Sequence, residues 1–161
     1  MNLEPLLQAS PVIQIHVASA IVAMFLGPLS IFRRRRDRLH KITGYIWIST
    51  MLVAATSALF IAELRLVGCF SPIHLLTPLV YWSIWRAISF VRAGNIADHS
   101  RAMKSLHVQA LGIAGLFTLM PGRIMSDVLF ASSPWLGFAV VATLMVLAYA
   151  RASFNRRSNV T

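Results

Sequence analysis

The chain has 161 residues, of which 57% are hydrophobic and only 12% are charged, and its mean hydropathy is +0.69. Soluble domains carry about 25% charged residues, so this composition excludes an ordinary soluble domain. The formal net charge is +10, but the basic residues stand in short blocks between long apolar stretches. That arrangement favours orientation in a membrane and attraction to anionic lipids over binding to nucleic acid. With Cys69 as its one cysteine, the chain forms no intrachain disulfide.

Five apolar stretches are long enough, or nearly so, to cross a bilayer, since about 20 helical residues span its hydrocarbon core. Backbone groups in lipid must be hydrogen-bonded within the protein, and this requirement favours helices. The stretches cover residues 12–32, 42–62, 72–91, 102–121 and 135–150, the last being short. The predicted fold class is therefore all-α: a polytopic transmembrane bundle of about five helices that makes one integral-membrane domain over residues 1–161.

Basic residues are distributed unevenly between the two ends of these stretches. Twelve arginines and lysines flank the first connection, the third connection and the C-terminal tail, whereas only Arg65 and Arg123 lie at the opposite ends. Because positive charge stays on the cytoplasmic side, we predict an N-terminus outside and a C-terminus in the cytoplasm. The run RRRRDR at 33–38 then anchors the inner face and contacts anionic lipids. The expected location is the inner membrane, with several passes.

Histidines stand near the ends of four predicted helices. His16 and His74 lie at the outer level, His40 and His99 at the inner level, and His107 about one and a half turns into the fourth helix. A b-type haem between helices is held by axial imidazoles, commonly one from each of two facing helices. We therefore predict an outer haem b between His16 and His74, and an inner one between His40 and either His99 or His107. The layout resembles that of the ascorbate-reducible transmembrane cytochromes b, with which the chain shares no local motif.

Other interpretations of the same residues stay open. Each histidine could be an amphipathic residue at the membrane interface. His99, Met103 and His107 share one helix face at i, i+4 and i+8, so a copper ion held by two imidazoles and a thioether is an alternative. Asp98 could accept the second ring N–H of His99 or cap the fourth helix.

Two arginines near or within helices also have alternative roles. Arg123, at the outer end of the fourth helix, could pair with a haem propionate or an anionic substrate, or could anchor the helix at the interface. Arg86, inside the third helix, must reach the surface, pair with another group or line a cavity.

Four segments carry a resemblance to a known family: LHKITG at 39–44, SPIHLL at 71–76, RAGNIADHSRAM at 92–103 and GLFTLMPGRIM at 115–125. Over about residues 12–126 the chain resembles a family of small bacterial membrane proteins that is catalogued as a domain of unknown function. The family's His-x-x-x-Gly element corresponds to His40 and Gly44, and its His-x-x-x-Met element to His99 and Met103.

The resemblance also sorts the remaining histidines. His16 and His74 fall on the family's pattern, whereas His107 does not. The chain departs from the pattern at three positions where the family often has arginine, tryptophan and histidine, and these are Ser100, Ala102 and Ser126.

These patterns favour a membrane-embedded b-type haem protein that passes electrons between quinone or a small reductant and a partner. Its axial ligands would be His16, His40, His74 and His99, with His107 in reserve. The alternative is a non-catalytic accessory or assembly subunit. Such a subunit would pack against a larger membrane complex through its apolar helices and its basic inner loop.

Overall fold

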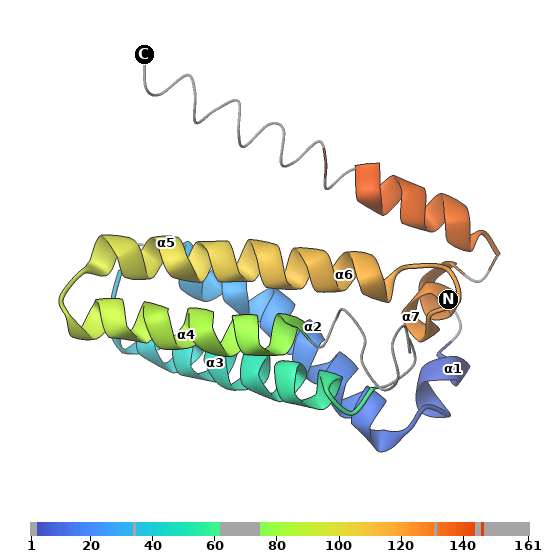
Figure 1. Ribbon diagram of the computed structural model, residues 1–161, viewed down its shortest axis with the longest axis horizontal. Helices are drawn as coiled ribbons and strands as arrows, with labels where there is room; N and C mark the ends of the chain where they lie inside the picture. Colours follow the sequence, from blue (N-terminus) through green and yellow to red (C-terminus); the bar gives the residue numbers. More distant parts are fainter. Residues whose placement is uncertain (1–2, 34, 62–74, 131, 144–145, 147–161) are drawn as a thin grey trace, which may run out of the picture. The chain divides into compact units, whose positions relative to one another are not determined.

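The computed structural model describes residues 3–33, 35–61, 75–130, 132–143 and 146 (Figure 1). In this part of the chain every regular element is helical and there is no strand, so the all-α class is confirmed. The chain divides into two compact units, and each is described by itself. The first, called the main unit here, is Ala9–Leu111, and the second comprises Met1–Gln8 and Gly112–Thr161.

The main unit is built on a close pairing of α2 (Pro11–Ile31) with α3 (Arg38–Ala58). Pro11 suits the start of α2, because the first helical N–H has no partner within the helix. Ser19, Ala23 and Gly27 are buried at intervals of four residues, so they form one narrow stripe of small side chains on α2. Small residues leave room for side chains of neighbouring helices, and at Gly27 this space is taken by the rings of His107 and Trp47.

The start of α3 is fixed by Asp37, which lies within the basic run. Its carboxylate accepts a hydrogen bond from the backbone N–H of His40 at 3.0 Å, so Asp37 is the N-cap. The same carboxylate pairs with Arg33, at 3.0 Å from Nε and 2.5 Å from Nη2. The Arg33 guanidinium, together with the N–H of His40, holds the pKa of Asp37 well below its usual range. Asp37 therefore stays charged near neutral pH and keeps His40 in the first turn of α3.

A tight turn joins α4 (Leu76–Arg92) to α5 (Ile96–Leu106), and the two helices lie side by side (Figure 1). The backbone N–H of Asn95 donates to Phe90, and that of Gly94 donates to Val91, which closes the end of α4. Gly94 has φ 75°, a left-handed conformation that favours glycine. Asn95 then caps α5 by accepting from the N–H of Asp98 at 3.1 Å.

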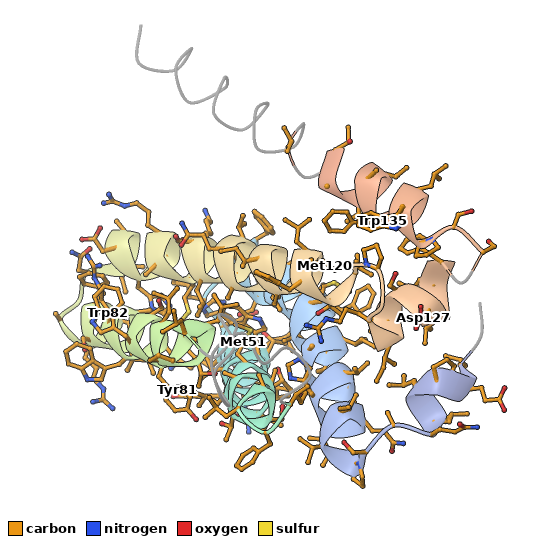
Figure 2. The ribbon with its side chains drawn as sticks, turned by 45° about the vertical axis from the view of Figure 1, so that its right-hand side comes forward. Met51, Tyr81, Trp82, Met120, Asp127 and Trp135 are labelled. Atoms are coloured by element: carbon orange, nitrogen blue, oxygen red, sulfur yellow. The ribbon has the colours of Figure 1, made fainter. Side chains whose placement is uncertain are left out.

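The core of the main unit lies between these four helices. Trp47 and Met51 of α3 are almost fully buried there, and Figure 2 shows Met51 among the helices. Hydrogen bonds also join α4 to α3: the Thr77 hydroxyl donates to the Ala55 carbonyl at 2.8 Å, and the Tyr81 and Thr56 hydroxyls lie 2.7 Å apart. The core comprises Ala23, Trp47, Met51, Val80, Ile84, Ala87, Met103, Leu106 and Ala110.

After α5 the helix changes form. His107–Leu111 is a π-helical segment, η2, and such segments occur often at functional sites. In the second unit, the short helix α1 (Glu4–Leu7) packs against α7 (Ile124–Phe130), and α6 (Gly112–Thr118) also contacts α7. A further helix covers Pro134–Thr143, and Trp135 near its start is largely exposed (Figure 2).

The described helices differ from the predicted spans in their bounds, and the number of five spanning helices stays a prediction. Prediction and structure agree within a residue at both ends of α2. The helix predicted at 42–62 begins at Arg38, because Asp37 caps it there, and the one predicted at 102–121 begins at Ile96, because Asn95 caps it. The short helices α1 and α7 were not predicted.

By length and hydropathy, one described helix, α2, has the character of a complete membrane span. The pair Ile124–Phe130 and Pro134–Thr143, bent by 95°, meets the same standard only if it is counted as one broken span.

Candidate functional site

A cavity of about 590 Å³ lies in the main unit between α2, α3, α4 and α5. Pockets for cofactors and other small molecules are typically about 300–1,000 Å³, with mostly apolar walls and a few polar groups. Two histidines line this cavity, His40 from α3 and His99 from α5. The apolar part of its wall consists of Ile31, Trp47, Ile48, Ile88, Val91, Ile96 and Met103.

The imidazole of His40 is oriented by the neighbouring helix α2. Its Nδ1 lies 3.2 Å from the carbonyl oxygen of Ser30. Because a carbonyl oxygen only accepts, Nδ1 carries the hydrogen and donates it. Nε2 of the neutral ring is then a lone-pair atom, which is the form that binds a metal.

The imidazole of His99 is oriented in the same way by α4. Its Nδ1–H donates to the carbonyl oxygen of Ala87 at 2.8 Å. The turn at Gly94 sends α5 back along α4, which brings His99 beside this carbonyl. Both predicted roles of Asp98 are wrong, because its carboxylate instead pairs with Arg101 at 2.8 Å and accepts from the Asn95 side chain at 2.6 Å.

Two imidazoles with their Nδ1 atoms held by backbone carbonyls therefore line one cavity. A metal-binding histidine usually donates its other ring N–H to a carbonyl or carboxylate, which fixes the ring and raises its basicity as a ligand. Gly44, one turn after His40, and Met103, one turn after His99, line the same cavity. The absence of a side chain at Gly44 leaves room for a flat ligand close to α3.

His16 shows the same bonding pattern at the other end of α2. Its Nδ1 lies 2.9 Å from the Ala54 carbonyl oxygen and 3.1 Å from the Ser57 hydroxyl oxygen. His16 does not line the cavity of His40 and His99. Its predicted partner, His74, lies outside the described residues, so the outer pair stays a prediction.

His107 has a different environment from the other histidines. Its ring packs on Trp47, with ring centroids 5.9 Å apart, and it is not among the residues that line the cavity. A Cβ atom at Gly27 would lie only 2.3 Å from His107 Nδ1, so this imidazole fills the space that the glycine leaves. The buried atoms His107 Nδ1 and Trp47 Nε1 have no hydrogen-bond partner in the described part of the chain. This contact was not predicted from the sequence, although the stripe of small residues on α2 could have indicated it.

The remaining predicted residues lie elsewhere. Arg86 stacks over Trp82 and Phe90, at 5.1 and 5.3 Å from their ring centroids, on an exposed face of α4. Arg123 lies in the turn before α7, in the second unit, so its proposed relation to His16 stays a prediction. Among the described residues, no three His, Cys, Asp or Glu side chains are grouped to hold a metal ion.

The sequence matches a family model described as "Predicted membrane protein (DUF2306)" over residues 13–151. The chain belongs to the DUF2306 family. The resemblance found at the LHKITG and RAGNIADHSRAM segments is thereby confirmed, as is the expectation of a membrane protein. No curated protein and no solved structure matches the chain.

The two elements by which the chain resembled the DUF2306 family meet in space. His40 and Gly44 of the first element, and His99 and Met103 of the second, all line the cavity, although 54 residues of chain separate Gly44 from His99. Ser100, where the family often has arginine, also lines it. Of the other two departures, Ala102 packs against the core and does not line the cavity. Ser126 is fully buried in the second unit, and its hydroxyl has no partner among the described residues.

Proposed function

We propose that the protein is a b-type haem protein of the bacterial inner membrane, and that the cavity between His40 and His99 holds the haem. It would pass electrons between quinone or a small reductant and a partner. The observation that carries the proposal is the matched bonding of the two imidazoles: each donates Nδ1–H to a carbonyl of another helix, and both rings line one cavity.

The cavity has the chemistry that haem b requires. The imidazoles of His40 on α3 and His99 on α5 would hold the haem iron, and the aliphatic wall would suit the apolar face of the macrocycle. Bound haem would supply a one-electron redox centre. The protein's own residues would set its potential through the imidazole–carbonyl bonds and the apolar surroundings.

We place the chain in the membrane as a bundle of five spanning helices, with the N-terminus outside and the C-terminus in the cytoplasm. Support comes from the family match, from the hydropathy of α2, and from the excess of basic residues beside the first and third connections. The cavity then lies at the cytoplasmic end of the bundle, where the basic run contacts anionic lipids.

We also propose a second haem b at the outer level, between His16 and His74, with Arg123 near its propionates. His16 supports this proposal, because its Nδ1–H donates to the Ala54 carbonyl and leaves Nε2 as a lone-pair atom. If the protein holds no haem, the alternative is an accessory or assembly subunit of a larger membrane complex.

Gly44→Leu is expected to block binding of the inner haem without unfolding the protein. The nearest atom to an added Cβ at Gly44 is Ser30 Oγ, at an ordinary 3.4 Å, so the backbone tolerates a side chain. The rest of a leucine side chain would enter the cavity that Gly44 lines. Titrating hemin into the apoprotein in lipid nanodiscs should show one fewer binding site than in wild type.

Gly115→Leu is the matched control for this substitution. Gly115 is also a helical glycine, but an added Cβ there would meet no atom within 4 Å. The control should bind as much hemin as wild type. Equal hemin binding by Gly44→Leu and wild type would contradict the assignment of the cavity as the haem site.

A further inference from the structure

The cavity of His40 and His99 has a strongly basic lining. Four cationic side chains line it, and these are Arg33, Arg36, Lys41 and Arg92, whereas no aspartate or glutamate does. They come from the α2–α3 connection, the first turn of α3 and the end of α4. The cavity thus combines aliphatic walls with a single sign of charge.

The acids near this region are already paired. Asp37 holds Arg33, and Asp98 holds Arg101, which does not line the cavity. Within the described residues, no ion pair involves Arg36, Lys41 or Arg92. These three side chains therefore have their charges available to a bound ligand.

We propose that Arg36, Lys41 and Arg92 bind the carboxylates of the ligand in this cavity, so that haem enters with its two propionates towards these cations. The inference rests on the proposed function, and it goes further by assigning the carboxylate-binding residues and the orientation of the cofactor.

An amphiphilic ligand such as haem complements this amphiphilic cavity. Isoleucines and Trp47 of the wall suit the ring system, and arginine binds carboxylates through paired charge-assisted hydrogen bonds. An exposed single ion pair contributes little. Several cations around one pair of carboxylates act together. The experiment measures their combined contribution to the affinity for hemin.

The test compares hemin with hemin dimethyl ester, which keeps the iron and the ring but lacks both carboxylates. Each is titrated into the apoprotein in phosphatidylcholine nanodiscs. Wild type is expected to bind hemin roughly tenfold tighter than the ester, because only hemin offers carboxylates to the three cations, and tenfold in affinity corresponds to about 1.4 kcal/mol.

The variant Arg36→Gln/Lys41→Gln/Arg92→Gln should lose this preference and still bind the ester as wild type does. The matched control is Arg38→Gln/Arg101→Gln/Lys104→Gln, which removes three exposed cations that do not line the cavity. The control should keep the preference for hemin. Unchanged ester binding also reports that each variant is folded.

Two outcomes would overturn the inference and leave the proposed function standing. In one, wild type binds both compounds equally; in the other, the preference for hemin over the ester survives the triple substitution. Repeating the titrations in phosphatidylglycerol nanodiscs identifies the source of the anion. If lipid phosphates occupied the three cations, the preference for hemin would vanish there, and the inference would fail. If neither compound binds wild type at all, the proposed function itself fails.

Discussion

His99→Ala is expected to remove the inner haem from the protein, or to leave it bound only through His40. His99 is the one histidine of α5, it lines the cavity, and its ring is held by the Ala87 carbonyl at 2.8 Å, so it is the imidazole of this helix that is placed to bind haem. Loss of one of two axial imidazoles should convert a low-spin haem into a high-spin one with much weaker binding. The visible spectrum and the haem content of the purified variant measure this effect.

Two further measurements make this prediction specific. Added imidazole should restore the low-spin spectrum of His99→Ala, because it supplies the missing ligand to the space left by the side chain. His107→Phe should keep the inner haem, since His107 packs on Trp47 and does not line the cavity. A normal low-spin haem in His99→Ala, or its loss in His107→Phe, would contradict the ligand assignment.

Gly27→Ala is expected to destabilise the main unit by about 1–3 kcal/mol, the usual cost of overpacking a core. An added Cβ would lie 2.3 Å from Nδ1 and 2.4 Å from Cε1 of His107, and 3.0 Å from Trp47 Nε1. These are ring atoms in the interior, so either the rings or α2 must move. The helical preference of alanine, worth about 1 kcal/mol over glycine, offsets only part of this cost. Thermal unfolding in detergent measures the change.

Gly115→Ala provides the control for Gly27→Ala, because its Cβ meets no atom within 4 Å. Its stability should equal or slightly exceed that of wild type. The double variant Gly27→Ala/His107→Ala should be less destabilised than the sum of the two single variants, since removing the imidazole relieves the clash. Additive losses would show that the contact between Gly27 and His107 is not the cause.

Much of the helical framework follows from local sequence signals. The apolar stretch at 12–32 predicts α2 to within a residue at each end, because Pro11 and the basic run mark its limits. Hydropathy alone placed the starts of α3 and α5 too late. Both helices begin in polar segments whose caps, Asp37 and Asn95, extend them by a turn or more beyond the apolar residues.

The candidate site was only partly predictable. The spacing of His40 and Gly44, and of His99 and Met103, indicated two elements, and the inner pairing of His40 had two possible partners. Only the packing of helices shows that His99 lines the same cavity as His40, and that His107 faces Gly27 and Trp47. The carbonyls of Ser30 and Ala87 have no sequence signal, because every residue has a carbonyl and only helix register selects these two.

The central claim is that His40 and His99 hold a haem b, and a visible spectrum tests it most directly. The protein would be purified in detergent from cells supplied with ample haem, and its oxidised and dithionite-reduced spectra recorded together with a pyridine haemochrome count. We predict a sharp reduced α-band and one haem b per chain, or two if His16 and His74 hold a second. A colourless protein would contradict the account, and the cavity of His40 and His99 would then belong to an accessory subunit of a larger membrane complex.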